Sequence, residues 1–133
     1  MSALVTDTHS AIWYLLPSPR LSPAAKRVFD EAAANGEPIY VSAITLIEMA
    51  YLIEKGRLPE SDIQALTNEL QNPSSSFELV PIDLNIARAL RLIPRADVPD
   101  MPDRIIAATA LHLGLPLVTR DSKIRAANLT TVW

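Results

Sequence analysis

Residues 103–121, with the sequence DRIIAATALHLGLPLVTRD, contain the unit from which we infer the fold. Apolar side chains at helical spacing extend from about Asp103 to Leu113, and Gly114 follows them as a residue just past a helix end. The stretch PLVTR, residues 116–120, is short and rich in branched apolar residues, as a buried strand is. A helix that leads directly into a buried strand is typical of a mainly parallel sheet covered by helices.

The same alternation of strands and helices extends over the whole chain. It predicts a three-layer α/β/α domain with a mainly parallel central sheet. There is no repeat, low-complexity tract or long linker, so we expect a single domain that spans residues 1–133. The expected strands are 3–7, 38–42, 77–82, 116–120 and 129–133, and the expected helices are 9–16, 22–35, 43–53, 59–72, 84–93, 103–113 and 122–127.

The composition excludes several classes of protein. No apolar run approaches the ~18 residues that span a bilayer, so no membrane segment is expected. The start, MSALVTD, has no basic segment and the chain has no cysteine, which together favour a cytoplasmic protein without disulfides. The net charge of −3 does not indicate nucleic-acid binding, which would have to come from a local cluster of arginines and lysines. No glycine belongs to a phosphate-binding loop motif.

Several acidic residues lie where a parallel sheet places its ligands, beyond the carboxyl ends of the strands and near the point where strand order reverses. Asp7 ends the first strand, and Asp121 follows the strand 116–120. If these two strands are neighbours, the two acids share one edge of the sheet. Asp103 starts a helix after a proline-rich loop, and Asp100 lies three residues before it.

Glu48 interrupts the otherwise apolar helix AITLIEMAYLI, residues 43–53, where it shares a face with Ile44 and Tyr51. Burying an ionised carboxylate without a partner is costly, and the next basic residue, Lys55, is seven positions away. A divalent cation shared with the three aspartates would remove this cost. Ligands that are all oxygen favour Mg²⁺ or Mn²⁺. Crowded carboxylates also share protons, so without a cation one of them should titrate at an unusually high pH.

Three motifs in this order, VTDTHSAIWYL, SAITLIEMAYL and DRIIAATALHLGLPLVTRD, resemble the PIN-domain ribonucleases, especially the VapC-like toxins of bacterial toxin–antitoxin pairs. The resemblance covers about residues 4–130. It implies a PIN-like domain that hydrolyses RNA phosphodiester bonds at an Mg²⁺ or Mn²⁺ site. The residues that it places at this site, as cation ligands and catalytic groups, are Asp7, Glu48, Asp103 and Asp121.

Further residues are assigned around this quartet. The resemblance places a hydroxyl-bearing helix start at Ser42 or Thr45. Arg104 and Arg120 each neighbour a site acid, which makes them candidates to bind the phosphates of RNA. Asp100, in the DMPDR stretch, departs from the family pattern and has three interpretations: an acid behind the ligands, a spare cation ligand, or only a helix cap.

The helix 43–53 is apolar on nearly every side, which is more than one core face requires. A homodimer interface or a groove for a partner's amphipathic segment would cover the apolar surface that the core does not bury. The resemblance implies both a homodimer and a cognate antitoxin protein. On the first helix, we expect Ile12, Trp13 and Leu16 to belong to the core, and we assign no catalytic role to His9.

Competing interpretations are open at this stage. Each aspartate can serve only as a helix cap, and Glu48 can be neutralised by Arg104 or Arg120. A non-catalytic PIN-like binding module is one competing function, although such modules usually lose one of the acids. An aspartate-based phosphotransfer domain is another. A receiver-like form of it needs a lysine at the end of a late strand, where this chain has Arg120 and Asp121.

Overall fold

The computed structural model describes residues 3–126 and 129–133. Five strands form one parallel sheet in the order β3-β2-β1-β4-β5, so the expected fold class is confirmed. The strands are shorter than the apolar stretches suggested, because hydrogen-bonded pairing covers only their central residues. They are β1 (Leu4–Thr6), β2 (Ile39–Ser42), β3 (Phe77–Val80), β4 (Leu117–Val118) and β5 (Thr131–Val132).

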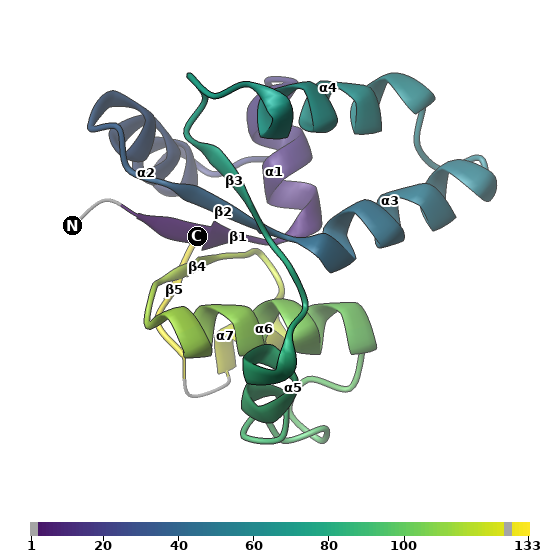
Figure 1. The fold of residues 1–133 in the computed structure, drawn as a ribbon, viewed down its shortest axis with the longest axis vertical. Helices are drawn as coiled ribbons and strands as arrows, with labels where there is room; N and C mark the ends of the chain where they lie inside the picture. Colours follow the sequence, from purple (N-terminus) through teal and green to yellow (C-terminus); the bar gives the residue numbers. More distant parts are fainter. Residues whose placement is uncertain (1–2, 127–128) are drawn as a thin grey trace.

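Helices cover both faces of the sheet and complete the three layers (Figure 1). Helices α1, α2 and α4 lie on one face and α5, α6 and α7 on the other, while α3 projects past the carboxyl end of β2. Within the described residues, none of the helices is long and apolar enough to cross a bilayer. Their bounds are α1 (Thr8–Leu15), α2 (Pro23–Ala34), α3 (Ala43–Glu54), α4 (Glu60–Gln71), α5 (Leu84–Leu90), α6 (Met101–Leu113) and α7 (Ser122–Ala126).

The core is divided by the sheet into two hydrophobic clusters. Leu4, Ile39 and Phe77 point to the side of α1, α2 and α4. Val5 and Leu117 point to the side of α5, α6 and α7. This division follows from the geometry of a strand, in which successive side chains point to opposite faces. Every central strand is therefore apolar on both sides, as the near-continuous apolar runs indicated.

The strand order reverses at β1, which has β2 on one side and β4 on the other. The register pairs Val5 with Leu117 and Thr6 with Val118. The backbone N–H of Asp7 continues this pairing, because it donates to the carbonyl of Val118 at 3.2 Å. The segments that follow β1 and β4 therefore leave the sheet side by side, as expected for a ligand site at a point of strand-order reversal.

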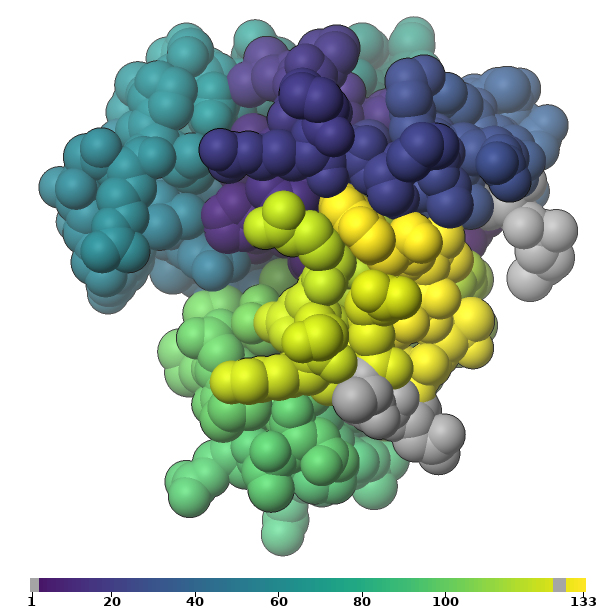
Figure 2. Space-filling model, turned by 180° about the vertical axis from the view of Figure 1, so that it is seen from behind, coloured from purple at the N-terminus to yellow at the C-terminus, as the bar shows by residue number. Residues whose placement is uncertain are grey.

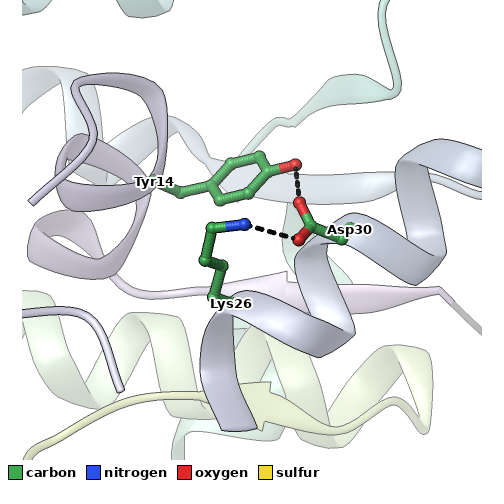
Figure 3. A network of polar contacts seen from close by, with 3 residues as sticks. All are labelled: Tyr14, Lys26 and Asp30. Carbon is green, nitrogen blue, oxygen red and sulfur yellow. Dashed lines mark hydrogen bonds and ion pairs between the residues drawn. The ribbon is translucent and has the colours of Figure 1, made fainter. Parts of the chain in front are cut away.

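A polar network fastens α1 to α2 on the outer side of one helical layer (Figure 3). The hydroxyl of Tyr14 donates to Asp30 at 2.9 Å, and the ammonium group of Lys26 lies 2.8 Å from the other oxygen of the same carboxylate. The ring of Tyr14 stacks on Phe29 with centroids 4.5 Å apart. Burial, the hydrogen bond to Asp30 and its negative charge raise the pKa of Tyr14 to about 12, so the hydroxyl stays a donor at neutral pH.

One local expectation is wrong, and one helix begins slightly earlier than expected. Leu16 is 41% exposed because α1 ends at Leu15, and Leu16 takes the C-cap position instead of continuing into the core. Helix α6 begins at Met101 instead of Asp103. The earlier start is explained by Asp100, whose side chain accepts a hydrogen bond from the N–H of Asp103 and so caps the helix.

Gly114 ends α6 with a φ of 66°, and nothing lies within 4 Å of the position that a Cβ atom would take. We expect Gly114→Ala to lower the free energy of unfolding by about 1 kcal/mol through backbone strain alone. Gly114→Asn should lose less, because asparagine tolerates left-handed conformations. Urea denaturation of both variants measures the difference. Unchanged stability of the alanine variant would contradict this account of the helix end.

Candidate active site

A cavity of about 510 Å³ opens at the carboxyl ends of β1 and β4. It brings together all four acids of the predicted quartet, which come from four separate segments of the sequence. Asp100 and Arg120, which the sequence analysis named as additional candidates, also line the cavity. The lining residues are Asp7, His9, Trp13, Arg20, Glu48, Asp100, Asp103, Arg120 and Asp121.

Asp7 directly follows β1, and Asp121 comes three residues after the end of the paired strand β4. Asp7 caps α1 by accepting a hydrogen bond from the N–H of Ser10 at 2.9 Å. Asp121 accepts from the N–H of Lys123 at 2.8 Å, and its own N–H donates to the hydroxyl of Thr119 at 3.0 Å. Both acids are therefore helix caps, and both line the cavity. A cap engages one carboxylate oxygen, so the two roles are compatible.

Glu48 is oriented by a chain of buried hydroxyl groups. The hydroxyl of Thr8 donates to Oε1 of Glu48 at 2.6 Å, and Thr8 and Thr45 share a second hydrogen bond at 3.1 Å. Because the single hydroxyl proton of Thr8 is used for Glu48, Thr45 is the donor in the second bond. Thr8 and Thr45 are almost fully buried. The first turn of α1 therefore holds the carboxylate of α3 toward the cavity.

The remaining predicted residues lie outside the cavity lining. Ser42 is buried and caps α3, since its hydroxyl accepts from the N–H of Ile44 at 3.2 Å. Thr45 is buried and hydrogen-bonded to Thr8. Arg104 points away, and its Nε donates to the carbonyl of Ile93 at 2.8 Å. Of the two predicted arginines, the structure brings Arg120 to the acids and leaves Arg104 to brace α6 against the segment after α5.

In the described part of the chain, the acids of the cavity form no ion pair with a basic side chain. Within residues 3–126 and 129–133, the only ion pair joins Lys26 and Asp30, and both residues lie outside the cavity. Burial, the charge of Asp100, and a hydrogen bond and charge from Asp121 raise the pKa of Asp103 to about 8, with a smaller contribution from the charge of Glu48. A carboxyl that titrates this high is the sign of crowded acids that the sequence led us to expect.

The donor groups of this cavity fit a hard divalent cation. They are carboxylate oxygens, the ligands that Mg²⁺ and Mn²⁺ prefer, and burial together with the charges of neighbouring acids raises the pKa of Asp103 to about 8. In the described part of the chain, no group of three or more His, Cys, Asp or Glu side chains is placed to hold a metal ion by itself. Mg²⁺ usually keeps several waters in protein sites and needs only one or two carboxylates as direct ligands.

Sequence reasoning missed three residues of the cavity: His9, Trp13 and Arg20. His9 and Trp13 are four positions apart on α1, directly after Asp7, and this spacing on one helical face was the available signal. Trp13 is largely buried, as expected of a core residue, but its ring also borders the site. Arg20 lies in an irregular segment after α1, where no periodicity could place it.

Comparison with known protein families gives a match over nearly the whole chain, because residues 4–128 match the model of the PIN domain. A curated relative is Ribonuclease VapC22 of Mycobacterium tuberculosis. It is 32% identical over 136 aligned positions, which cover 100% of both chains.

Two solved structures are similar to this chain over nearly its full length. A toxin–antitoxin complex from Klebsiella pneumoniae is 26% identical with a TM-score of 0.65, covering 98% of this chain and 96% of that one. The VapBC2 complex from Rickettsia felis, bound to a DNA fragment from its promoter, has a TM-score of 0.70 at 18% identity. That match covers 97% of this chain and 96% of the other, and it shows the fold alone.

The raised pKa of Asp103 makes the stability of the cation-free protein depend on pH. Folding raises this pKa from 3.8 to about 8, so between these values the folded chain binds more protons than the unfolded chain. This contribution to the free energy of unfolding is present at low pH and is lost as the pH rises through 8. Urea denaturation in a chelator at several pH values should show the decrease, and Asp103→Asn should make it smaller. An identical pH dependence in the variant would contradict the assignment.

Proposed function

The chain belongs to the PIN-domain family, and we propose that it is an endoribonuclease, the toxin of a toxin–antitoxin pair, that depends on Mg²⁺ or Mn²⁺. The single observation that carries the proposal is the meeting of Asp7, Glu48, Asp103 and Asp121 in one cavity. Acidic residues that served only as helix caps would have no need to meet in one cavity. The relative VapC22, named a ribonuclease, supports the same reaction.

The proposed roles follow from the surroundings of each side chain. The four acids hold the cation directly or through waters, and Asp100, at the edge of the cavity, is a further acid within their field. When bound, the cation would neutralise charge on the scissile phosphate and activate an attacking water. The hydroxyl of Thr8 keeps Glu48 in a fixed orientation. Attack by water on the phosphorus leaves a 5′-phosphate on one product and a 3′-hydroxyl on the other.

The two competing functions are less well supported by the cavity. A receiver-like phosphotransfer domain needs a lysine beside its strand-end acids, but the basic groups here are His9, Arg20 and Arg120. A non-catalytic module does not need a cluster of carboxylates in which burial and neighbouring charges raise the pKa of Asp103 to about 8. The geometry therefore favours hydrolysis over both.

A second hollow, of about 450 Å³, adjoins the site and suggests where a partner binds. It runs between α3 and the start of α6, where Ile47, Tyr51 and Met101 expose apolar surface. Lys55 and Arg57 lie at the same hollow. We assign it to an amphipathic, partly acidic segment of the cognate antitoxin, because apolar side chains would fill the groove and acidic ones would meet the two cations.

The position of this groove explains how such a partner would inhibit the enzyme. Glu48 and Asp100 line both hollows, so a segment in the groove reaches the edge of the active site. A separate apolar surface lies at α5 and the turn after it, where Leu84 is exposed and Leu92 is 72% exposed. We assign that second surface to the proposed homodimer. The two kinds of association would then use different faces.

We expect Asp7→Asn to lower the rate of RNA cleavage by about 100-fold or more, because it removes one charge from the cation site. Asparagine is as good a helix cap as aspartate, so α1 should be retained. The measurement is cleavage of RNA with Mg²⁺ or Mn²⁺, with chelator, and with the cation restored.

Asp83→Asn is the matched control for this substitution. Asp83 caps α5 by accepting from the N–H of Ile86 at 3.0 Å, and it lies outside the cavity. The control makes the same chemical change at the same kind of position, and it should cleave RNA like the unmodified chain. Full activity of the Asp7 variant, or activity that chelator leaves unchanged, would refute the proposed function.

Two further substitutions separate the proposed partner surfaces. Tyr51→Glu places a charge in the groove and should weaken binding of the proposed cognate antitoxin, while leaving the homodimer intact. Leu92→Glu should do the opposite. Light scattering measures the mass of the chain alone, and calorimetry measures binding of the partner. If Tyr51→Glu leaves partner binding unchanged, the groove is not the antitoxin site.

A further inference from the structure

One wall of the cavity is formed by an aromatic cluster that gathers residues from three distant segments. The ring of Trp13, on α1, is its centre. The guanidinium carbon of Arg120, after β4, lies 4.8 Å from the centroid of this ring. The ring of His9 lies 5.7 Å away and tilted, and the ring of Trp133, after β5, lies 6.1 Å away edge-on. Figure 2 shows the C-terminal residues, in yellow, packed against the blue and purple N-terminal part of the chain.

Arg120 is held in an unusual way for an arginine among carboxylates. Asp121 is its neighbour and four more acids line the same cavity, yet the described residues contain no hydrogen bond or ion pair from its guanidinium group. Its contact is instead with the face of Trp13, at a distance typical of a cation–π interaction. The N–H donors of Arg120 are therefore left for a group that enters the cavity.

Arg104 shows the contrast within the same protein. It also neighbours a site acid, Asp103, but its Nε is engaged by the carbonyl of Ile93. It therefore has a structural partner, whereas Arg120 is exposed and has none among the polar groups of the described chain. Of the two, Arg120 is the arginine whose planar fork of donors can take a phosphate in a bidentate way.

Trp13 cannot itself stack on a base of the substrate. It is 9% exposed, and Arg120, His9 and Trp133 surround its ring. Its available function at the site is to fix the side chains around it. The cation–π contact holds the guanidinium on the wall of the cavity, away from the carboxylates that would otherwise pair with it.

We propose that Trp13 is a positioning residue that holds Arg120 ready to bind a backbone phosphate of the RNA next to the scissile one, and that Trp133 supports Trp13 from behind. This inference rests on the proposed function, since it names how that site takes its substrate. Arg120 contacts Trp13 and forms no ion pair with the acids, so we expect it to act on substrate binding more than on the chemical step. In this proposal the acids bind the cation, and the side of the cavity formed by Trp13 and Arg120 binds the RNA strand.

The test is a double-mutant cycle with Arg120→Gln and Trp13→Leu, read through kcat and KM for cleavage of a fluorescent single-stranded RNA of mixed sequence. Arg120→Gln should raise KM by about tenfold with little change in kcat, since it removes binding that ground state and transition state share. Trp13→Leu should do the same. In the Arg120→Gln background, Trp13→Leu should have no further effect, because the residue acts through the arginine.

A second measurement does not depend on cleavage. Affinity for the same RNA is measured by fluorescence anisotropy at several salt concentrations, in the Asp7→Asn background. Loss of one phosphate contact should lower the slope of log affinity against log salt by about one for Arg120→Gln and for Trp13→Leu. Trp13→Phe retains a smaller aromatic face and should restore part of the slope and of KM. Arg27→Gln, at an exposed arginine on α2 outside the cavity, is the control and should change neither.

The outcomes are distinct. If the unmodified chain does not cleave RNA, the proposed function fails, and the salt dependence of binding still tests the role of Arg120. If Trp13→Leu lowers kcat equally in both backgrounds, its role is structural and this inference is wrong. An unchanged KM and salt slope in Arg120→Gln would overturn it as well. Should Trp13→Leu fail to fold, Trp13→Phe replaces it. Its effects on KM and kcat are then compared between the unmodified chain and the Arg120→Gln variant, and the same two outcomes apply.

Discussion

The parallel pairing of β1 with β4 determines where the acidic side chains meet, and most features of the site depend on it. The register places Thr6 beside Val118, so the chain leaves both strands at the same level of the sheet. Asp7 follows β1 at once and Asp121 follows β4 after two further residues, and each acid begins the next helical segment. Helices α3 and α6 need to contribute only one acid each to complete the group. A slip of one residue in this pairing would turn the side chains of a strand to the opposite face.

The acids that cap helices in this protein are also the ones for which we propose a role in the active site. Asp7, Asp100 and Asp121 each accept a hydrogen bond from a backbone N–H near the start of a helical segment, as a simple cap does. These starts lie at the edge of the sheet where the cavity opens. Capping directs each carboxylate toward a helix terminus, whose N–H groups and dipole stabilise negative charge. Concentrating acids there is therefore less costly than burying them elsewhere, although burial and the neighbouring negative charges still raise the pKa of Asp103.

The fold and the acids were predictable because they follow from local rules. Strand ends place Asp7 and Asp121, and a carboxylate on an apolar helix singles out Glu48. Side-chain direction was not predictable in the same way. Arg104 and Arg120 each stand next to a site acid, but Arg104 turns to a carbonyl 11 positions earlier and Arg120 turns to Trp13. The direction of each arginine side chain depends on tertiary packing. Arg20, in an irregular segment, had no pattern from which to predict it.

The two edges of the sheet restrict how this molecule can associate with others. One edge is β3, four residues long, where Glu78 is exposed and Pro81 follows the strand. The other is β5, which has two residues. Adding a strand from another chain needs a long, flat row of unpaired N–H and C=O groups, and short edges with a charge or a proline do not offer one. Higher-order assembly by sheet extension, including fibril growth from the native state, is therefore disfavoured, and complexes have to form through helix faces.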